Sequence, residues 1–403
     1  MRSSARSWLA ICLFGFVAAT PALSGTYSNV TQFALPSGSQ PQGIVTGPDG
    51  ALWVADYAGY IVRLATDGSY IQYPACCGPD QIVSGPDGAL WFTEWEGSQI
   101  GRITTSGTLT GYTIESGAPG LNGLTVGPDG AMWFTESNSN KIGRITTDGA
   151  VTEYAVPTFG SFPHGIVTGP DGALWFTEVF GDRIGRITTQ GAFTEYPVTT
   201  PGSLPEEITL GPDGALWFTE LGANKIGRIT TSGAVAEYRV NGPSGIIPGP
   251  DGALWFTSVN GFGRITVGGV VTVFRVSGST SDEDLLTTGP DGTLWFTQAD
   301  IATVAHAPFC ALGFSASFNA GTLTMNYNLG ITTPATFNIL LANSAGPVGK
   351  PFSKAIGPVT PVQAFTMIWS PFPNLGAVTV HPVLATGTGD VQCSEWATVD
   401  SSH

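Results

Sequence analysis

The sequence is short of several features, and each shortage excludes a class of protein. Only 15 of its 403 residues are Lys or Arg, against 30 Asp and Glu, and this balance disfavours partners that carry phosphates, such as nucleic acids and anionic membranes. No apolar run reaches the roughly 20 residues needed to span a bilayer. The four histidines are too scattered for a serine or cysteine triad to be argued.

The N-terminus has the pattern of an export signal. Arg2 and Arg6 precede an apolar run over residues 8–19, and the small residues of TPALSG follow. We therefore expect residues 1–24 to be a signal peptide that is cleaved after Ser24. Loss of the two arginines leaves 13 basic residues and a net charge of −17. The mature protein is expected to be soluble, monomeric, and secreted or periplasmic.

Cysteines are also few. Cys12 lies in the signal, so four remain, and an oxidising compartment would allow them to pair. We expect a disulfide between Cys310 and Cys393, which bracket the last part of the chain. Cys76 and Cys77 are adjacent, and either a strained vicinal disulfide or two free thiols would result. Since no CxxC pair occurs, a structural zinc site is not expected.

What the sequence does have is one phrase repeated seven times, in its cleanest form GPDGALWFTE at residues 169–178. Successive copies are separated by 38, 42, 42, 42, 38 and 40 residues, a period typical of four-stranded propeller blades. The copies begin at Gly47, Gly85, Gly127, Gly169, Gly211, Gly249 and Gly289.

Each repeat predicts one antiparallel sheet. HGIVT at residues 164–168 is a short apolar strand, and Pro-Asp-Gly at 170–172 suits a tight turn. ALWFTE returns as the second strand, RIGRITT gives the third, and AFTEYPV gives the fourth.

The ends of the repeat region predict a closed ring, because an open one would leave a sheet edge unpaired. The last repeat stops at its third strand, IATVAHA (residues 301–307), whereas NVTQFALP (residues 29–36) matches the pattern of a fourth strand. We expect an all-β fold in which the N-terminal strand completes the last blade of a seven-bladed propeller over residues 25–307. Residues 308–403 lack the phrase and predict a small β-sandwich, to which the sequence assigns no function.

Two features that recur in nearly every repeat are interpreted as structural. The tryptophans of the phrase are expected to pack between blades, and the arginines of the third strand to tie neighbouring backbones or carboxylates together. These residues are Trp53, Trp91, Trp133, Trp175, Trp217, Trp255 and Trp295, with Arg102, Arg144, Arg186 and Arg228.

Function is expected where equivalent positions differ, and two such positions should ring one mouth of the channel. One lies at the entrance of the first strand and the other at the exit of the second. The first is occupied by Gln42, Asp80, Asn122, His164, Glu206, Ser244 and Asp284. The second is occupied by Asp56, Glu94, Glu136, Glu178, Glu220, Ser258 and Gln298.

The acidic sector around His164 is the candidate site. We interpret His164 and Glu206 as catalytic, and Glu178 and Glu220 as oxygen ligands for Mg²⁺ or Ca²⁺. The alternative remains open that the repeated glutamates bond to backbone amides or pair with arginines, and that the single histidine is structural.

Aromatic side chains flank this sector. Phe159, Phe162, Phe180 and Trp95 lie in loops at the same rim and could form an apolar wall for a small-molecule or peptide ligand. They could equally be loop packing.

The run PHGIVTGPDGALWFTE (residues 163–178), followed by DRIGRITTQGAFTEYPV, closely resembles the virginiamycin B lyases, also called streptogramin B lyases. The resemblance covers about residues 26–307. It implies a Mg²⁺-dependent lyase that opens a cyclic depsipeptide at its ester by elimination. The family pattern has two P-H-G histidines in neighbouring blades, each needed for proton transfer or metal binding.

This chain departs from that pattern. Only Pro163-His164-Gly165 keeps the motif, and Glu206 follows the proline of the next blade. Where the family carries its histidine pair, this chain has Ser244 and Asp284, with Asp282 and Gln298 at the positions of the accompanying glutamates. Three hypotheses remain: a lyase with a shifted site, a non-catalytic binding propeller, and a metal-dependent hydrolase of the lactonase type.

Overall fold

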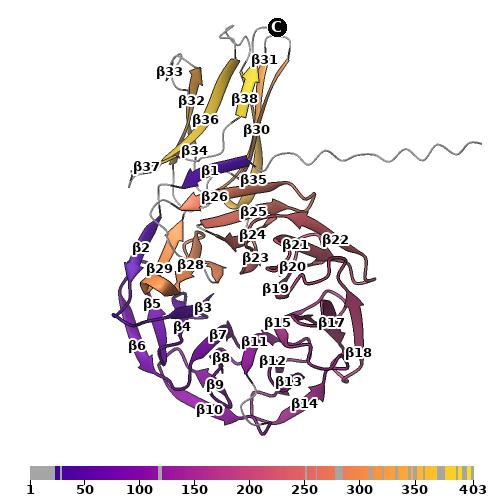
Figure 1. The fold of residues 1–403 in the computed structure, drawn as a ribbon. Helices are drawn as coiled ribbons and strands as arrows, with labels where there is room; N and C mark the ends of the chain where they lie inside the picture. Colours follow the sequence, from indigo (N-terminus) through magenta and orange to yellow (C-terminus); the bar gives the residue numbers. More distant parts are fainter. Residues whose placement is uncertain are drawn as a thin grey trace, which may run out of the picture.

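The computed structural model describes residues 23–27, 30–116, 120–249, 252–259, 261–276 and 285–307, and beyond these a set of strands between residues 312 and 400. Its main part is a ring of seven antiparallel sheets around a central channel (Figure 1). This confirms the predicted all-β, seven-bladed propeller.

Blades 1 to 3 each consist of four strands in sequence order from the channel outwards. Blade 1 contains β3 (Pro41–Thr46), β4 (Leu52–Asp56), β5 (Tyr60–Leu64) and β6 (Tyr70–Pro74). Blade 2 contains β7 (Pro79–Ser84), β8 (Leu90–Glu94), β9 (Gln99–Ile103) and β10 (Leu109–Thr113). Blade 3 contains β11 (Leu121–Val126), β12 (Met132–Glu136), β13 (Lys141–Ile145) and β14 (Val151–Ala155).

Blades 4 and 5 follow the same order and carry the predicted site. Blade 4 contains β15 (Pro163–Thr168), β16 (Leu174–Glu178), β17 (Arg183–Ile187) and β18 (Phe193–Pro197). Blade 5 contains β19 (Pro205–Leu210), β20 (Leu216–Glu220), β21 (Lys225–Ile229) and β22 (Val235–Arg239).

Blades 6 and 7 close the ring, and both take a strand from the N-terminal segment. Blade 6 contains β23 (Ile246–Pro248), β24 (Ala253–Ser258), β25 (Gly261–Thr266) and β26 (Val271–Val276), with β1 (Leu23–Tyr27) added in parallel to β26. Blade 7 contains β27 (Leu286–Thr288), β28 (Leu294–Gln298) and β29 (Thr303–Ala307), with the short 3₁₀ turn η1 (Ala299–Ile301) between the last two. Its outer strand is β2 (Thr31–Ala34), which confirms the predicted closure by the N-terminus.

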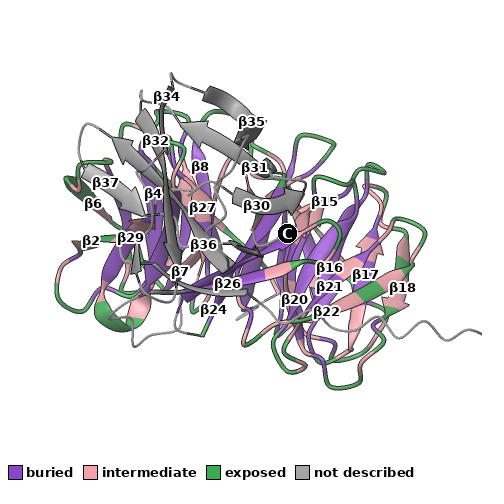
Figure 2. Cartoon of the chain, turned by 90° about the horizontal axis from the view of Figure 1, so that it is seen from above, coloured by how far each residue is buried: buried purple, intermediate pink, exposed green. Residues whose placement is uncertain are grey.

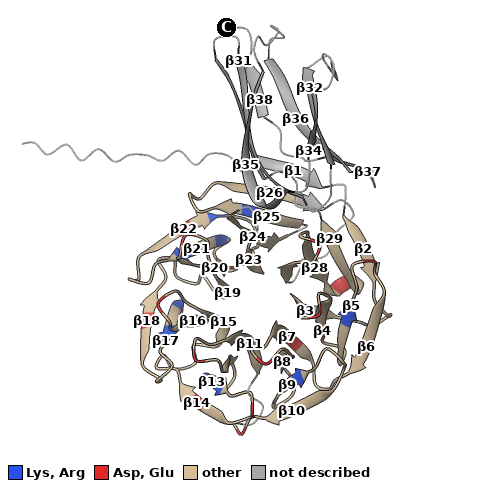
Figure 3. Cartoon of the chain, turned by 180° about the vertical axis from the view of Figure 1, so that it is seen from behind, with Lys and Arg blue, Asp and Glu red and all other residues tan. Residues whose placement is uncertain are grey.

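The repeated phrase builds the turn end of each blade. In blade 4, Asp171 accepts hydrogen bonds from the indole of Trp175 (3.0 Å) and from Nε of Arg186 (2.7 Å), so one carboxylate links the turn to the second and third strands. Gly169 lies under the tryptophan ring, and a Cβ there would come within 2.4 Å of the indole. The predicted carboxylate partners of the third-strand arginines are thus the aspartates of the phrase. Figure 3 shows the basic residues on these third strands.

The core lies in the seams between blades. Trp175 is fully buried and packs with Ile184 of its own blade and with Ile208, Leu216 and Phe218 of blade 5. The other seams repeat this arrangement, and buried residues follow the inner strands while exposed residues gather in the loops (Figure 2). The tryptophans therefore pack between blades, as predicted.

After the propeller, the backbone forms two further sheets. One contains β30 (Leu312–Asn319), β31 (Thr322–Ile331) and β35 (Val359–Trp369). The other contains β32 (Ala335–Asn343), β33 (Gly346–Pro347), β34 (Phe352–Ile356), β36 (Ala377–Thr386), β37 (Gly389–Gln392) and β38 (Ala397–Asp400). That these two sheets form a β-sandwich stays a prediction.

Three other predictions concern the signal peptide, the disulfide and membrane-spanning segments. Residues 1–22, with most of the predicted signal peptide, lie outside the described residues, and β1 begins two residues before the expected cleavage point. Cys310 and Cys393 also lie outside them. Within the described part of the chain, no helix is long and apolar enough to cross a membrane.

Candidate functional site in the channel

A bulge at the start of the innermost strand positions His164. In blade 4, Pro163 lies opposite Glu178 and Ile166 opposite Phe176, so the register shifts across His164 and Gly165. The hydroxyl of Thr177 accepts a hydrogen bond from the Gly165 N–H (2.9 Å) and donates one to the carbonyl of Glu206 in blade 5 (2.5 Å). One buried threonine therefore fixes the bulge and also ties it to the next blade.

Blade 5 has the same bulge, with a carboxylate in place of the glycine. The register shifts between Pro205 and Ile208, and the Glu207 N–H donates to the hydroxyl of Thr219 (3.0 Å). The seam between blades 3 and 4 is tied in the same way, because the Thr135 hydroxyl of blade 3 donates to the His164 carbonyl (2.6 Å). The innermost strands are thus held in a fixed relation around the channel.

Side chains from three blades converge in the channel. His164 Nδ1 lies 3.6 Å from Glu207 Oε1, and the same oxygen lies 3.5 Å from Nε2 of Gln81, which comes from blade 2. His164 also bonds to the backbone of Glu206. The three innermost strands β7, β15 and β19 all border the central channel in Figure 1.

Burial gives this group unusual protonation. Desolvation lowers the pKa of His164 to about 4, against the opposing effect of its bond to the Glu206 backbone, so the ring is neutral at pH 7. Desolvation, with the nearby charges of Glu206 and Asp80, raises the pKa of Glu207 to about 8. The site therefore holds a neutral imidazole with an unpartnered Nδ1 beside a carboxyl group that is largely protonated at neutral pH.

The glutamates predicted as metal ligands are buried at the ends of strands β16 and β20. Glu178 and Glu220 end the second strands and are fully buried. Burial, with the charge of Glu195 for Glu178 and of Glu237 for Glu220, raises the pKa of each to about 7. Glu195 and Glu237 are on the outermost strands of the same two blades.

The structure does not gather the predicted metal ligands into one group. Among the described residues, one set of three or more His, Cys, Asp or Glu has ligand atoms all within 4.8 Å of one another, and it consists of Cys76, Cys77 and Glu94 in blade 2. The role of Glu178 and Glu220 as metal ligands stays a prediction.

Three of the four predicted lining aromatics meet at the mouth. The Phe162 ring lies 5.0 Å from that of Phe180 and 6.3 Å from that of Trp95, which belongs to blade 2. Phe180 is 67% exposed. Phe162 has φ of 57°, held by hydrogen bonds between the backbones of residues 161–162 and 179–180. Phe159 is 98% exposed and takes no part in these ring contacts.

Sequence reasoning missed Glu207 and Gln81, although a signal was present. Four residues before the phrase, four repeats have glycine, at positions 43, 123, 165 and 245. Glycine is required there because the next blade approaches closely: a Cβ on Gly165 would lie 2.6 Å from the carbonyl oxygen of Glu206. Blades 2 and 5 have Gln81 and Glu207 in place of this glycine. These two side chains contact each other beside His164.

Blades 6 and 7 carry no histidine at the matching positions. Ser244 donates its N–H to the carbonyl of Thr257, and Gln298 accepts hydrogen bonds from Gln32 (2.8 Å) and Thr303 (2.9 Å). Gln298 is thus engaged within blade 7. Asp282 and Asp284 lie outside the described residues.

The fold is a seven-bladed propeller in which His164 of blade 4 lies beside Glu207 of blade 5. The sequence profile described as the virginiamycin B lyase family matches residues 28–241. The structure of virginiamycin B lyase from Staphylococcus aureus is 36% identical, with a TM-score of 0.66 over 69% of this chain and 98% of that one. The chain therefore belongs to the virginiamycin B lyase family.

Two more structures extend the comparison. A catalytically inactive histidine-to-alanine variant of the Staphylococcus aureus enzyme, with quinupristin, matches with the same identity, TM-score and coverage. The extracellular domain of a putative one-component system from B. thetaiotaomicron is 12% identical, with a TM-score of 0.58 over 93% of this chain and 58% of that one, which shows a similar fold alone. No curated protein sequence matches the chain.

Proposed function

We propose that this protein is an exported lyase that opens the ring of a cyclic depsipeptide by elimination at its ester, with His164 and Glu207 as its reacting pair. The observation that carries the proposal is the 3.6 Å approach of His164 Nδ1 to Glu207 Oε1 inside the channel. Glu207 takes the part that the sequence analysis gave to Glu206, because Glu206 reaches the histidine through its backbone.

The reaction needs a base and an electrophile. Neutral His164 removes the proton from the carbon next to a carbonyl, the ester C–O bond on the adjacent carbon breaks, and the product gains a C=C bond and a free carboxylate. Because a base of pKa about 4 accepts a carbon-bound proton weakly, the carbonyl must be polarised strongly. Glu207 would help to polarise the oxygen that develops enolate charge, by holding a divalent cation.

A divalent cation fits the same sector. Besides burial, the charges of Glu206 and Asp80 raise the pKa of Glu207, and a cation would offset those charges. Glu206 and Glu207 would hold Mg²⁺, which in proteins takes one or two carboxylates and keeps water as its other ligands. When bound, the ion would supply Lewis-acid polarisation of the carbonyl.

The aromatic mouth supports a ligand with apolar groups. Trp95, Phe162 and Phe180 offer ring faces from blades 2 and 4 at the rim of the channel. Such a surface suits the aromatic and apolar side chains of a cyclic peptide.

Incubation of the mature protein with quinupristin, with Mg²⁺ or with a chelator, tests the proposal by chromatography and mass spectrometry. Elimination gives a linear product of unchanged mass that forms only with Mg²⁺. A product heavier by one water would indicate a hydrolase of the lactonase type.

A second function, ligand binding without catalysis, is favoured by one observation. Ser244 occupies the position in blade 6 where the family pattern has a histidine, and its N–H is used by the backbone of Thr257. If quinupristin stays intact but binds the protein, and Trp95→Ala weakens that binding, the propeller is a binding protein.

A further inference from the structure

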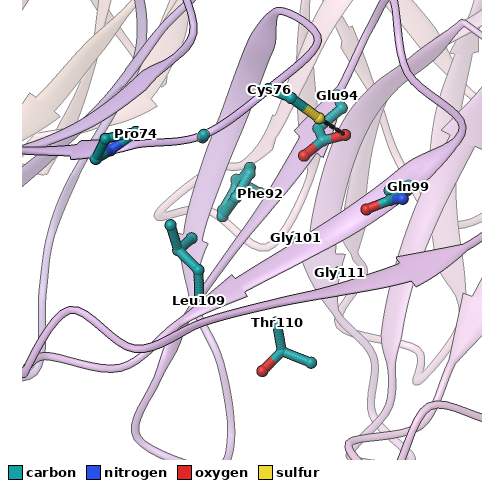
Figure 4. A pocket seen from close by; sticks show the side chains of 10 residues that line it. Pro74, Cys76, Phe92, Glu94, Gln99, Gly101, Leu109, Thr110 and Gly111 are labelled. Carbon is teal, nitrogen blue, oxygen red and sulfur yellow. Dashed lines mark hydrogen bonds between the residues drawn. The ribbon is translucent and has the colours of Figure 1, made fainter.

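A second cluster of reactive groups lies where strand β6 of blade 1 leads into blade 2. Cys76 and Cys77 follow strand β6 as exposed free thiols, and Glu94, which is 4% exposed, ends strand β8. The Cys76 thiol donates to Glu94 Oε2 at 3.4 Å, as Figure 4 shows. Each of the three residues has a ligand atom within 4.8 Å of the other two.

The backbone holds these groups together. Cys77 has a φ of 64°, and its carbonyl accepts a hydrogen bond from the Glu96 N–H (3.1 Å), while the Gly78 carbonyl accepts one from the Trp95 N–H (2.9 Å). The thiol loop is therefore tied to the strand end that carries Glu94. Gly97 leaves the room that the cluster needs, since a Cβ there would lie 2.7 Å from Glu94 Oε2 and 2.9 Å from the Cβ of Cys77.

Blade 2 lacks a carboxylate that blades 3 to 5 carry on their outermost strands. In those blades the outermost strand carries a glutamate whose charge raises the pKa of the carboxylate equivalent to Glu94. These outer glutamates are Glu153, Glu195 and Glu237. Blade 2 has Gly111 at that position, and a pocket of about 380 Å³ opens there, lined by Cys76, Phe92, Glu94 and Leu109 among others (Figure 4).

We propose that Cys76, Cys77 and Glu94 bind a thiophilic divalent cation such as Zn²⁺, with the fourth coordination position open to this pocket. Zinc binds thiolate sulfur at about 2.3 Å and carboxylate oxygen at about 2.0–2.2 Å in a tetrahedron, which places sulfur and oxygen about 3.5 Å apart. The separation of 3.4 Å between Cys76 Sγ and Glu94 Oε2 matches this geometry. Two thiolates and one carboxylate also offset the charge of the ion.

Zinc binds thiolates and not thiols, so cation binding releases protons and the affinity is expected to rise with pH. No CxxC pair is needed for this site, because the third ligand, Glu94, comes from the end of strand β8.

Titration of the fully reduced mature protein with Co²⁺ and Cd²⁺ tests the proposal through thiolate-to-metal charge-transfer absorption. The background variant carries Cys310→Ser and Cys393→Ser, so that only Cys76 and Cys77 supply thiols. We expect one cation per chain, and at least about a hundredfold weaker binding in Cys76→Ser and in Cys77→Ser. Glu94→Gln should weaken binding by about tenfold or more.

Glu136→Gln is the matched control, since it removes the equivalent carboxylate of blade 3, where no thiol lies nearby. It should leave cation affinity unchanged. Absence of charge-transfer absorption in the reduced background variant would overturn the proposal, as would binding that survives both cysteine substitutions. Because the readout is spectroscopic, it is independent of any lyase activity.

Discussion

The two ends of each blade follow opposite rules. At the turn end, the aspartate of the phrase repeats the same pair of bonds to tryptophan and arginine in blades 1 to 5, for example Asp171 with Trp175 and Arg186. At the mouth end, the innermost strands begin with different side chains. There His164 of blade 4 lies beside Glu207 of blade 5. Repetition builds the ring, and departures from it create the site.

The largest effect on stability should come from breaking a seam. Trp175→Ala removes a fully buried indole that stacks on Tyr196 at 5.4 Å, and should lower the free energy of unfolding by about 3–5 kcal/mol. Chemical denaturation measures this. Trp95→Ala, at the mouth, should cost less than about 1.5 kcal/mol, and equal costs would contradict the distinction between the two ends.

Replacement of a tie between blades should affect both stability and function. Thr177→Val leaves the Gly165 N–H and the Glu206 carbonyl without their partner, and should cost about 1–3 kcal/mol. It should also reduce turnover, because the bulge that positions His164 loosens. Thr257→Val is the control: its hydroxyl accepts from Gly245 in blade 6, so stability should fall while turnover per folded molecule stays the same. Equal losses of turnover in the two variants would argue against a reaction site in blades 4 and 5.

The fold was predictable because period, turn and strand pattern all agree within each repeat. Even closure by the N-terminal strand could be inferred from one unmatched strand at each end of the repeats. The site was less predictable. His164 stands out as a single exception, but Glu207 does not, because its position is significant only once the close approach at Gly165 is known. Likewise, sequence spacing placed Glu178 at the mouth, whereas the direction of its carboxylate depends on which face of the sheet it occupies.

The third effect is a pH dependence. The pKa of Glu207 in the folded protein is about 8, above its ordinary value of 4.5, so the fold binds more protons than the unfolded chain between these values. Its contribution to stability is therefore lost as pH rises from about 4.5 to about 8. Glu207→Gln should become more stable relative to wild type across this window, by up to about 1.4 kcal/mol for each pH unit. Denaturation at several pH values, with the exposed Glu115→Gln as control, measures this, and a flat difference for Glu207→Gln would argue against the raised pKa.

The smallest effect should come from the exposed rim of the turn end. Arg186→Gln breaks the ion pair with Asp171, in which both side chains are 22% exposed, and should cost no more than about 1 kcal/mol. Thermal unfolding at low and high salt checks this. A loss comparable to that of Trp175→Ala would mean that the arginines, and not the seams, hold the blades.

Turnover of quinupristin by His164→Ala and Ser244→Ala tests the central claim most directly, because the two positions are equivalent in blades 4 and 6. The account predicts that His164→Ala loses about a hundredfold or more in rate. Ser244→Ala should keep the rate of the wild type, with both variants folded as judged by circular dichroism. Loss of activity in Ser244→Ala with full activity in His164→Ala would contradict the account, and would place the reaction in blade 6.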